Sequence, residues 1–355
     1  MTKSTRISYV FIALTLVLVA WLQLATPLLA VMFSLFVLNK MNFARSKWLA
    51  VSLFVVVIFS ITYAAGHFLK AAVVALPKIA DTSIPSIIGW AQSQGVELPF
   101  TDYDSLKTVT IDTVKEQVHY VRNAANFARG ATREFAFLII GIVVAVSLFL
   151  NSQLDLDRAT HKVKNNLYSL CCEEIAARFW GFYESFARVM GAQIVISTIN
   201  TLLTSIFVVS VRLPFAPVVI GVTFLCGLLP VIGNLISNTI IVGVAFTVSP
   251  KMALAALVFL VVIHKLEYFL NSKIIGDRIR SPVWLTLLGL VVGERLMGLP
   301  GMILAPVILN YVKVEASRFE VAPPPSALPP LDSVEPPTPL RPEPAPLPES
   351  RVVSQ

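Results

Sequence analysis

Amide and hydroxyl side chains recur along one apolar stretch of the sequence, and their spacing could serve binding chemistry. The steps of four, three and four residues place them on one face of a helix: Gln193, Ser197, Asn200 and Thr204. Such a face favours hydrogen bonds between helices, each worth about 0.6 to 2 kcal/mol in a membrane. The alternative is a stripe of polar groups that lines a path for a solute.

A second polar group follows the motif GLLPVIGN at residues 227–234. Pro230 lacks an amide hydrogen and Gly233 tolerates backbone angles that other residues resist, so the motif predicts a break in a helix. Asn234 and Asn238 stand one turn apart just after this break. The start of a half-helix exposes amide hydrogens that suit binding of a polar solute. The alternative is that an asparagine there simply caps its own helix.

The third group is His264 with Glu267, three residues apart and therefore on one helix face. The pair could be a structural ion pair, or it could carry a proton for ion coupling. Lys265 beside it could extend to the lipid headgroups. Both interpretations of the His264–Glu267 pair stay open at this point.

Several kinds of chemistry find no motif in the sequence. It has no nucleotide-binding glycine loop, no GxSxG and no cysteine or histidine pair at metal-ligand spacing. Three cysteines, two of them adjacent, give no disulfide framework. We therefore expect no enzyme, no cofactor and no metal. The net charge of +7 does not indicate nucleic acid, because the basic residues cluster at the ends of apolar runs.

The elements that position these groups must be membrane helices. The chain is 56% hydrophobic with only 14% charged residues, against about 25% in soluble domains. This composition predicts an all-α polytopic membrane protein. The uncharged stretch 213–247 would make a helix of roughly 50 Å, longer than a hydrocarbon core of about 30 Å. It therefore predicts a Pro/Gly-broken helical hairpin hinged at Pro230.

The other apolar runs predict further passes. These are a hairpin over 7–38 that turns near Thr26–Pro27, single passes over 48–69, 135–150, 189–211 and 252–270, and a short pair over 282–292 and 298–312 around Gly293-Glu294-Arg295. In the last pair Gly289 and Gly293 form a GxxxG motif, which favours close helix packing. Basic residues flank the first hairpin at both ends, so the positive-inside rule predicts that both termini are cytoplasmic.

We expect the chain to divide into a membrane domain, residues 1–318, and a tail, residues 319–355. Within the first, 77–133 is expected to be an extracytoplasmic helical insert with an amphipathic helix over 103–127, and 151–188 a cytoplasmic amphipathic linker. Twelve of the 27 residues in 322–348 are proline, which predicts a disordered tail.

The C-terminal half also resembles a known family. The matching features, in order, are Gly221, GLLPVIG at 227–233, Leu266-Glu267, KIIG at 273–276 and GLPGMILAP at 298–306. With this order and spacing the chain resembles the autoinducer-2 exporter family of bacterial membrane proteins, over about residues 5–318. It departs from the family where Asn234 and Ser272 replace usual prolines, and where His264 and Lys265 replace frequent amides.

The resemblance implies about eight transmembrane helices per subunit, in a multi-pass homo-oligomer of the bacterial inner membrane. We expect a permease that exports a small polar metabolite or signalling molecule, autoinducer-2-like, without ATP. Its translocation residues would lie on the polar helix face and at the hinge: Gln193, Asn200, Thr204, Pro230, Gly233, Asn234 and Asn238. The alternative is a sodium/proton antiporter coupled through Glu267 and His264, with a cation as its partner. A third hypothesis, from another class, is a membrane scaffold that docks partners on its proline-rich tail.

Overall fold

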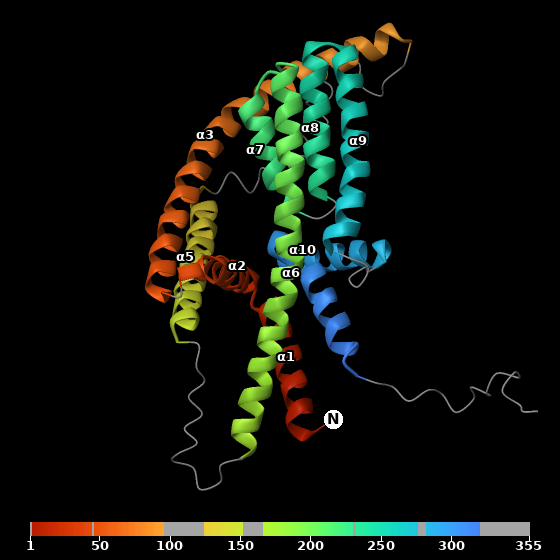
Figure 1. Ribbon diagram of the computed structural model, residues 1–355. Helices are drawn as coiled ribbons and strands as arrows, with labels where there is room; N and C mark the ends of the chain where they lie inside the picture. Colours follow the sequence, from red (N-terminus) through yellow and green to blue (C-terminus); the bar gives the residue numbers. More distant parts are fainter. Residues whose placement is uncertain are drawn as a thin grey trace, which may run out of the picture. The chain divides into compact units, whose positions relative to one another are not determined.

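The computed structural model describes residues 2–44, 46–95, 124–151, 166–229, 232–275 and 282–319 (Figure 1). The α-helices in these ranges are α1 Lys3–Trp21, α2 Ala25–Met41, α3 Lys47–Ser93, α5 Ala124–Leu150, α6 Leu167–Ser210, α7 Ala216–Gly227, α8 Ile232–Val248, α9 Pro250–Ile275 and α10 Val283–Ala316. A single 3-10 turn in these ranges spans Asn42–Ala44. No strand occurs in these ranges. The prediction of an all-α fold is confirmed. The chain divides into two units, Met1–Glu315 and Ala316–Gln355.

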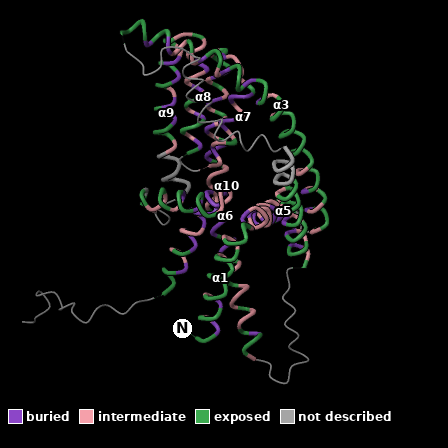
Figure 2. The backbone as a smooth tube through the Cα atoms, turned by 180° about the vertical axis from the view of Figure 1, so that it is seen from behind, coloured by how far each residue is buried: buried purple, intermediate pink, exposed green. Residues whose placement is uncertain are grey.

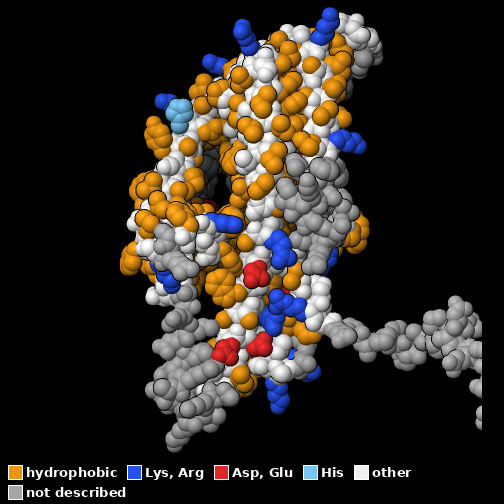
Figure 3. Space-filling view, viewed as in Figure 1, with side chains coloured by type: hydrophobic (Ala, Val, Ile, Leu, Met, Phe, Trp, Pro, Cys, Tyr) orange, Lys and Arg blue, Asp and Glu red, His pale blue; other side chains and the backbone are white. Residues whose placement is uncertain are grey.

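Five of the described helical segments are long and apolar enough to cross a membrane. They are Lys3–Trp21, Lys47–Ser93, Thr132–Leu150, Leu167–Ser210 and Trp284–Ala316, and α2, α7 and α8 are shorter apolar helices. Figure 3 shows hydrophobic side chains spread over the visible faces of α6 and α9, where a soluble protein would carry charge. The chain is therefore a multi-pass membrane protein, as predicted.

The first two helices meet at a different place from the one predicted. The chain turns at Leu22–Leu24, where Gln23 has a positive φ of 54°, and not at Thr26–Pro27. Pro27 instead lies in the first turn of α2, where its missing amide hydrogen breaks no helical hydrogen bond. The two helices have different main partners, since α1 packs on α6 and α2 on α5.

Helix α3 continues far beyond the predicted pass over 48–69, through Pro77 and Pro85 to Ser93. Each proline removes one helical hydrogen bond, yet the helix continues because small and apolar residues on one side of it are buried against α7 and α8: Ala72, Ala75 and Ile79. Tertiary packing outweighs the local preference to break. The predicted amphipathic helix 103–127 falls almost wholly outside the described residues.

Helix α6 is likewise longer than the predicted pass over 189–211. It begins at Leu167, where the side chain of Asn166 accepts a hydrogen bond of 2.8 Å from the amide of Ser169, and it runs unbroken to Ser210. The described end of the predicted linker 151–188 and the following pass are thus one helix. Residues 152–165 and the proline-rich tail from 320 onward lie outside the described residues.

Two apolar cores join these helices (Figure 2). The first is formed by α2, α3, α5, α6 and α10 around Met32, Phe54 and Phe186. The second is formed by α3 and α6 to α9 around Val208 and Val244. Helices α3 and α6 contribute to both cores, so their length connects the two.

Helix α10 is a hairpin of two arms that meet at Gly298, with φ 64° and ψ −151°. A side chain other than hydrogen would be strained at that φ. The turn lies a few residues beyond the predicted one at Gly293-Glu294-Arg295. The GxxxG prediction agrees with the packing: a Cβ on Gly293 would stand 2.5 Å from the carbonyl oxygen of Gly301, and one on Gly289 would stand 2.9 Å from Leu309.

Candidate functional site

The uncharged stretch 213–247 forms a hairpin of two short helices, as its length predicts. After α6 the chain turns through Arg212 and Phe215, both with positive φ, into α7, which ends at Gly227. Helix α8 begins at Ile232 and packs back against α7. Pro230, the predicted hinge, lies outside the described residues. The break that it predicts is present between the two helices.

Glycine permits the two arms of this hairpin to approach at their tip. A Cβ on Gly233 would stand 1.6 Å from the carbonyl oxygen of Cys226, and one on Gly227 would stand 2.5 Å from the hydroxyl of Ser197. A side chain at Gly233 would need the backbone of Cys226 to move, and one at Gly227 would need the side chain of Ser197 to move. The tip is therefore held tightly against α6.

Two residues of the polar stripe on α6 bind the carbonyl groups freed at the end of α7. Gln193 Nε2 donates to the carbonyl oxygen of Gly227 at 2.6 Å, and Ser197 Oγ donates to that of Phe224 at 2.8 Å. A freed carbonyl without a partner would be costly inside a membrane protein. This part of the stripe thus makes hydrogen bonds between helices.

The next residues surround a carboxylate, and we call Asn200, Asn234, His264 and Glu267 the Glu267 cluster. Asn234 Nδ2 donates to both oxygens of Glu267, at 2.9 and 2.7 Å, and Asn200 Nδ2 donates to Oε2 at 3.5 Å. His264 Nδ1 lies 3.9 Å from the same Oε2. Glu267 is 14% exposed, and α6, α8 and α9 each supply part of the cluster.

This arrangement surrounds the carboxylate with two amides and one imidazole. Within the described ranges no lysine or arginine pairs with Glu267. Two further oxygens on α6, Oδ1 of Asn200 and Oγ1 of Thr201, are buried without a hydrogen-bond partner among the described residues. Buried polar atoms are normally satisfied, so unpaired ones suggest a binding site. Such a set of oxygens and amides suits a cation, a proton or a hydroxylated solute.

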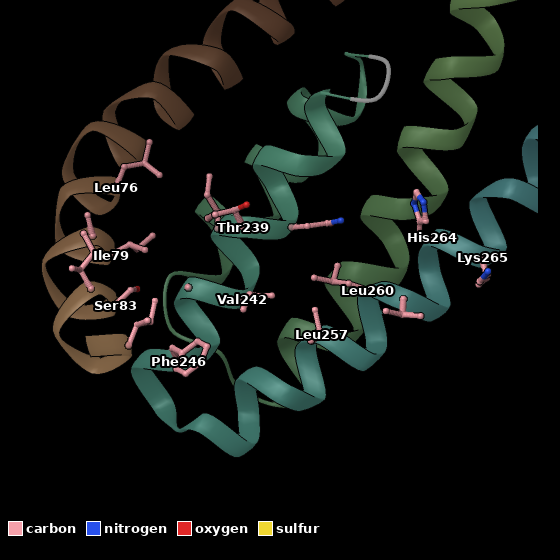
Figure 4. A pocket seen from close by; sticks show the side chains of 17 residues that line it. Leu76, Ile79, Ser83, Thr239, Val242, Phe246, Leu257, Leu260, His264 and Lys265 are labelled. Atoms are coloured by element: carbon pink, nitrogen blue, oxygen red, sulfur yellow. The ribbon is translucent and has the colours of Figure 1, made fainter. Parts of the chain in front are cut away.

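The structure does not bring all predicted residues together. Thr204 is buried on α6, one turn beyond Asn200, and no hydrogen bond within the described part joins it to the cluster. Asn238 lines a separate pocket between α3, α8 and α9 (Figure 4). His264 both lines that pocket and approaches Glu267. Whether any of these residues binds solute stays a prediction.

A second buried charged group was missed by the sequence analysis, and we call it the Arg178 cluster. Arg178 pairs with Glu315 at 2.5 Å and with Glu174 at 2.9 Å, and its guanidinium carbon lies 4.6 Å from the ring centroid of Tyr9. Tyr9 in turn donates its hydroxyl to Glu315 at 2.6 Å. Only the spacing of Glu174 and Arg178 was visible in the sequence, because Tyr9 and Glu315 come from the two ends of the domain.

Comparison with known proteins identifies a family of membrane transporters. The family profile described as "AI-2E family transporter" matches residues 7–317. A Bacillus subtilis (strain 168) protein, "Putative transport protein YdbI", is 28% identical over 200 residues. That alignment covers 54% of this chain and 57% of the length of the relative, so the chain spans little more than half of it.

Proposed function

The chain belongs to the AI-2E family of transporters, and from this premise we propose that it carries a small polar solute through the Glu267 cluster. The direction proposed is export, without ATP, of a hydroxylated metabolite or signalling molecule of the autoinducer-2 kind. The observation that carries the proposal is the carboxylate of Glu267 held by Asn234 and Asn200 beside a broken helix.

The chemistry of this cluster suits a solute rich in hydroxyl groups. A carboxylate accepts hydrogen bonds from hydroxyls, and hydrogen bonds to a charged group are the stronger ones. Amides add a donor and an acceptor each. The hairpin tip lies among protein helices, which is where irregular backbone is tolerated at membrane depth and where transporters of other folds bind their solutes.

Flux into vesicles tests the proposal. The purified full-length protein is reconstituted, and the uptake of a labelled polyhydroxylated signalling molecule is followed against empty vesicles. Asn234→Leu removes the main donor to Glu267, and we expect at least a tenfold loss of flux. The matched control is Glu184→Gln, an exposed position on α6 that should leave flux unchanged. Wild-type vesicles that move no such solute would refute export.

Cation/proton antiport is the second candidate, supported by the contact of His264 with Glu267 at 3.9 Å. A carboxylate without a lysine or arginine partner in the described structure can exchange a proton for sodium. Glu267→Gln separates the candidates, since glutamine keeps an acceptor oxygen but cannot ionise. Antiport predicts that pH-dependent sodium exchange disappears, whereas solute export predicts flux that survives this change.

The setting of the transporter is part of the proposal. We place it in the bacterial inner membrane as a homo-oligomer, with both termini in the cytoplasm. The basic residues around the first two helices support this orientation: Lys3, Arg6, Lys40 and Lys47. Labelling of single cysteines near both ends with an impermeant reagent tests the orientation in whole cells, and native mass spectrometry tests the subunit number.

A further inference from the structure

A pocket of about 760 Å³ lies between α3, α8 and α9 and adjoins the Glu267 cluster at His264, which belongs to both (Figure 4). Its volume is within the range of small-molecule binding sites. Eleven of its 17 lining residues are apolar. Figure 4 shows His264 and Lys265 toward one end and Phe246 toward the other. The pocket is therefore amphipathic along its length.

The pocket opens on the apolar surface of α9. Leu257 and Val261 line it and are nevertheless 50% and 54% exposed. Their neighbours on the same surface are exposed as well: Leu254, Val258 and Val262. In a membrane protein such a surface faces acyl chains, so an occupant can enter from the bilayer.

Two polar side chains in the wall, Lys265 and Ser83, indicate which polar groups the occupant must have. Lys265 is exposed and makes no ion pair in the described part of the chain, so the pocket has an uncompensated positive charge at that end. Glu267 does not line the pocket, because its carboxylate faces Asn234. The hydroxyl of Ser83, by contrast, is buried in the wall with no hydrogen-bond partner among the described residues.

These groups have the order found along a phospholipid. Ser83 packs beside Gly243, where a Cβ would stand 3.7 Å from its hydroxyl. Gly243 follows Thr239 by one turn of α8, roughly 5 to 6 Å along the axis. The contact of Asn234 with Glu267 sets Lys265 about two turns of α8 before Gly243, roughly 10 Å along the axis, so a lipid with its phosphate at Lys265 would extend its ester groups toward Ser83. The apolar end toward Phe246 would take an acyl chain.

We propose that this pocket binds one anionic phospholipid per subunit, with the phosphate against Lys265 and His264 and an ester carbonyl accepting a hydrogen bond from Ser83. The proposal does not depend on which solute the transporter carries. A free anion is a poor fit because most of the wall is apolar. A zwitterionic lipid would fit the apolar part equally well but would gain less from Lys265.

Native mass spectrometry of the full-length protein tests the lipid site. The delipidated protein is offered equal amounts of phosphatidylglycerol and phosphatidylcholine with identical chains, and the lipids retained per subunit are counted. We expect one retained lipid with a preference for phosphatidylglycerol. Lys265→Gln should lower that preference about fivefold, which corresponds to about 1 kcal/mol for one lysine at an anionic headgroup. Lys251→Gln, at the other end of α9, is the matched control and should change nothing.

Gly243→Leu tests the location of the lipid independently of charge. The added Cβ meets only Ser83, at an ordinary contact distance, so the helices can stay in place while the side chain fills the pocket. We expect both lipids to be lost. Equal retention of the two lipids by the wild type, an unaltered preference in Lys265→Gln, or a lipid retained in a folded Gly243→Leu variant would each overturn the proposal. So would a Gly243→Leu variant that changes the subunit number in place of the lipid count, since the pocket would then be an interface between copies.

Discussion

In the Arg178 cluster two carboxylates surround one guanidinium, whereas in the Glu267 cluster one carboxylate is held by two neutral amides. Both clusters join three helices: α1, α6 and α10 in the first, and α6, α8 and α9 in the second. They differ in how the charge is balanced. In the first, both carboxylates pair with Arg178, whereas in the second Glu267 pairs with no lysine or arginine of the described residues and lies near one histidine.

The difference separates a structural role from a binding role. A buried ion pair with additional hydrogen bonds fixes the helices that carry it, and it gives a solute little reason to intervene. A carboxylate that is held only by amides keeps its attraction for a proton, a cation or a hydroxyl group. The comparison predicts that mutation of the first cluster mainly lowers stability and that mutation of the second mainly changes transport.

The largest effect is expected from Arg178→Met. The change leaves Glu315 buried without its counter-ion, and the loss of one partner of a buried pair costs about 3 to 5 kcal/mol. Thermal unfolding in detergent micelles measures the loss. The double variant Arg178→Met with Glu315→Met should recover most of the stability, because the buried carboxylate is then removed and the remaining partner of Arg178, Glu174, is partly exposed to solvent. A single variant as stable as the wild type would remove the structural role of this cluster.

A smaller loss of stability is expected from Asn234→Leu. Two short hydrogen bonds to the Glu267 carboxylate disappear, and hydrogen bonds to charged groups contribute about 1.5 to 3 kcal/mol. The same unfolding assay applies, with Asn238→Leu as the matched control one turn along α8. Equal losses in the two variants would mean that Asn234 does not support Glu267.

The smallest effect on stability is expected from Glu267→Gln, at less than about 1 kcal/mol. Glutamine has the same shape and retains an oxygen for the amide of Asn234, so little packing or hydrogen bonding is lost. Its effect should appear in pH-dependent exchange instead. A stability loss as large as that of Arg178→Met would show that both clusters are structural, and the contrast between them would fail.

The break between α7 and α8 could be predicted, because it depends on local chemistry. An uncharged stretch too long for the membrane, with Pro230 and Gly233 in its middle, has to fold back. The pairing of His264 with Glu267 follows from spacing alone. The location of Asn234 directly after the hinge could also be predicted, but its hydrogen bond to Glu267 on α9 could not.

Other features depend on contacts between distant segments and were therefore hidden. Prolines predict the end of a helix, yet α3 passes through Pro77 and Pro85 because α7 and α8 cover its small residues. The Arg178 cluster combines Tyr9 with Glu315, 306 residues apart, and no local pattern marks either one. The first turn was placed at Pro27 because proline is a strong signal, although the chain bends at Gln23.

The length of α3 has a mechanical consequence. Its 47 residues measure about 70 Å, more than twice the thickness of a hydrocarbon core, so a rotation of about 10° about one end would carry the other end about 12 Å. Pro77 and Pro85 each leave a carbonyl one turn earlier, on Val73 and Asp81, without its helical partner. Helix α3 should therefore bend most easily at these two prolines. A displacement of α3 in one apolar core would reach the other core through them.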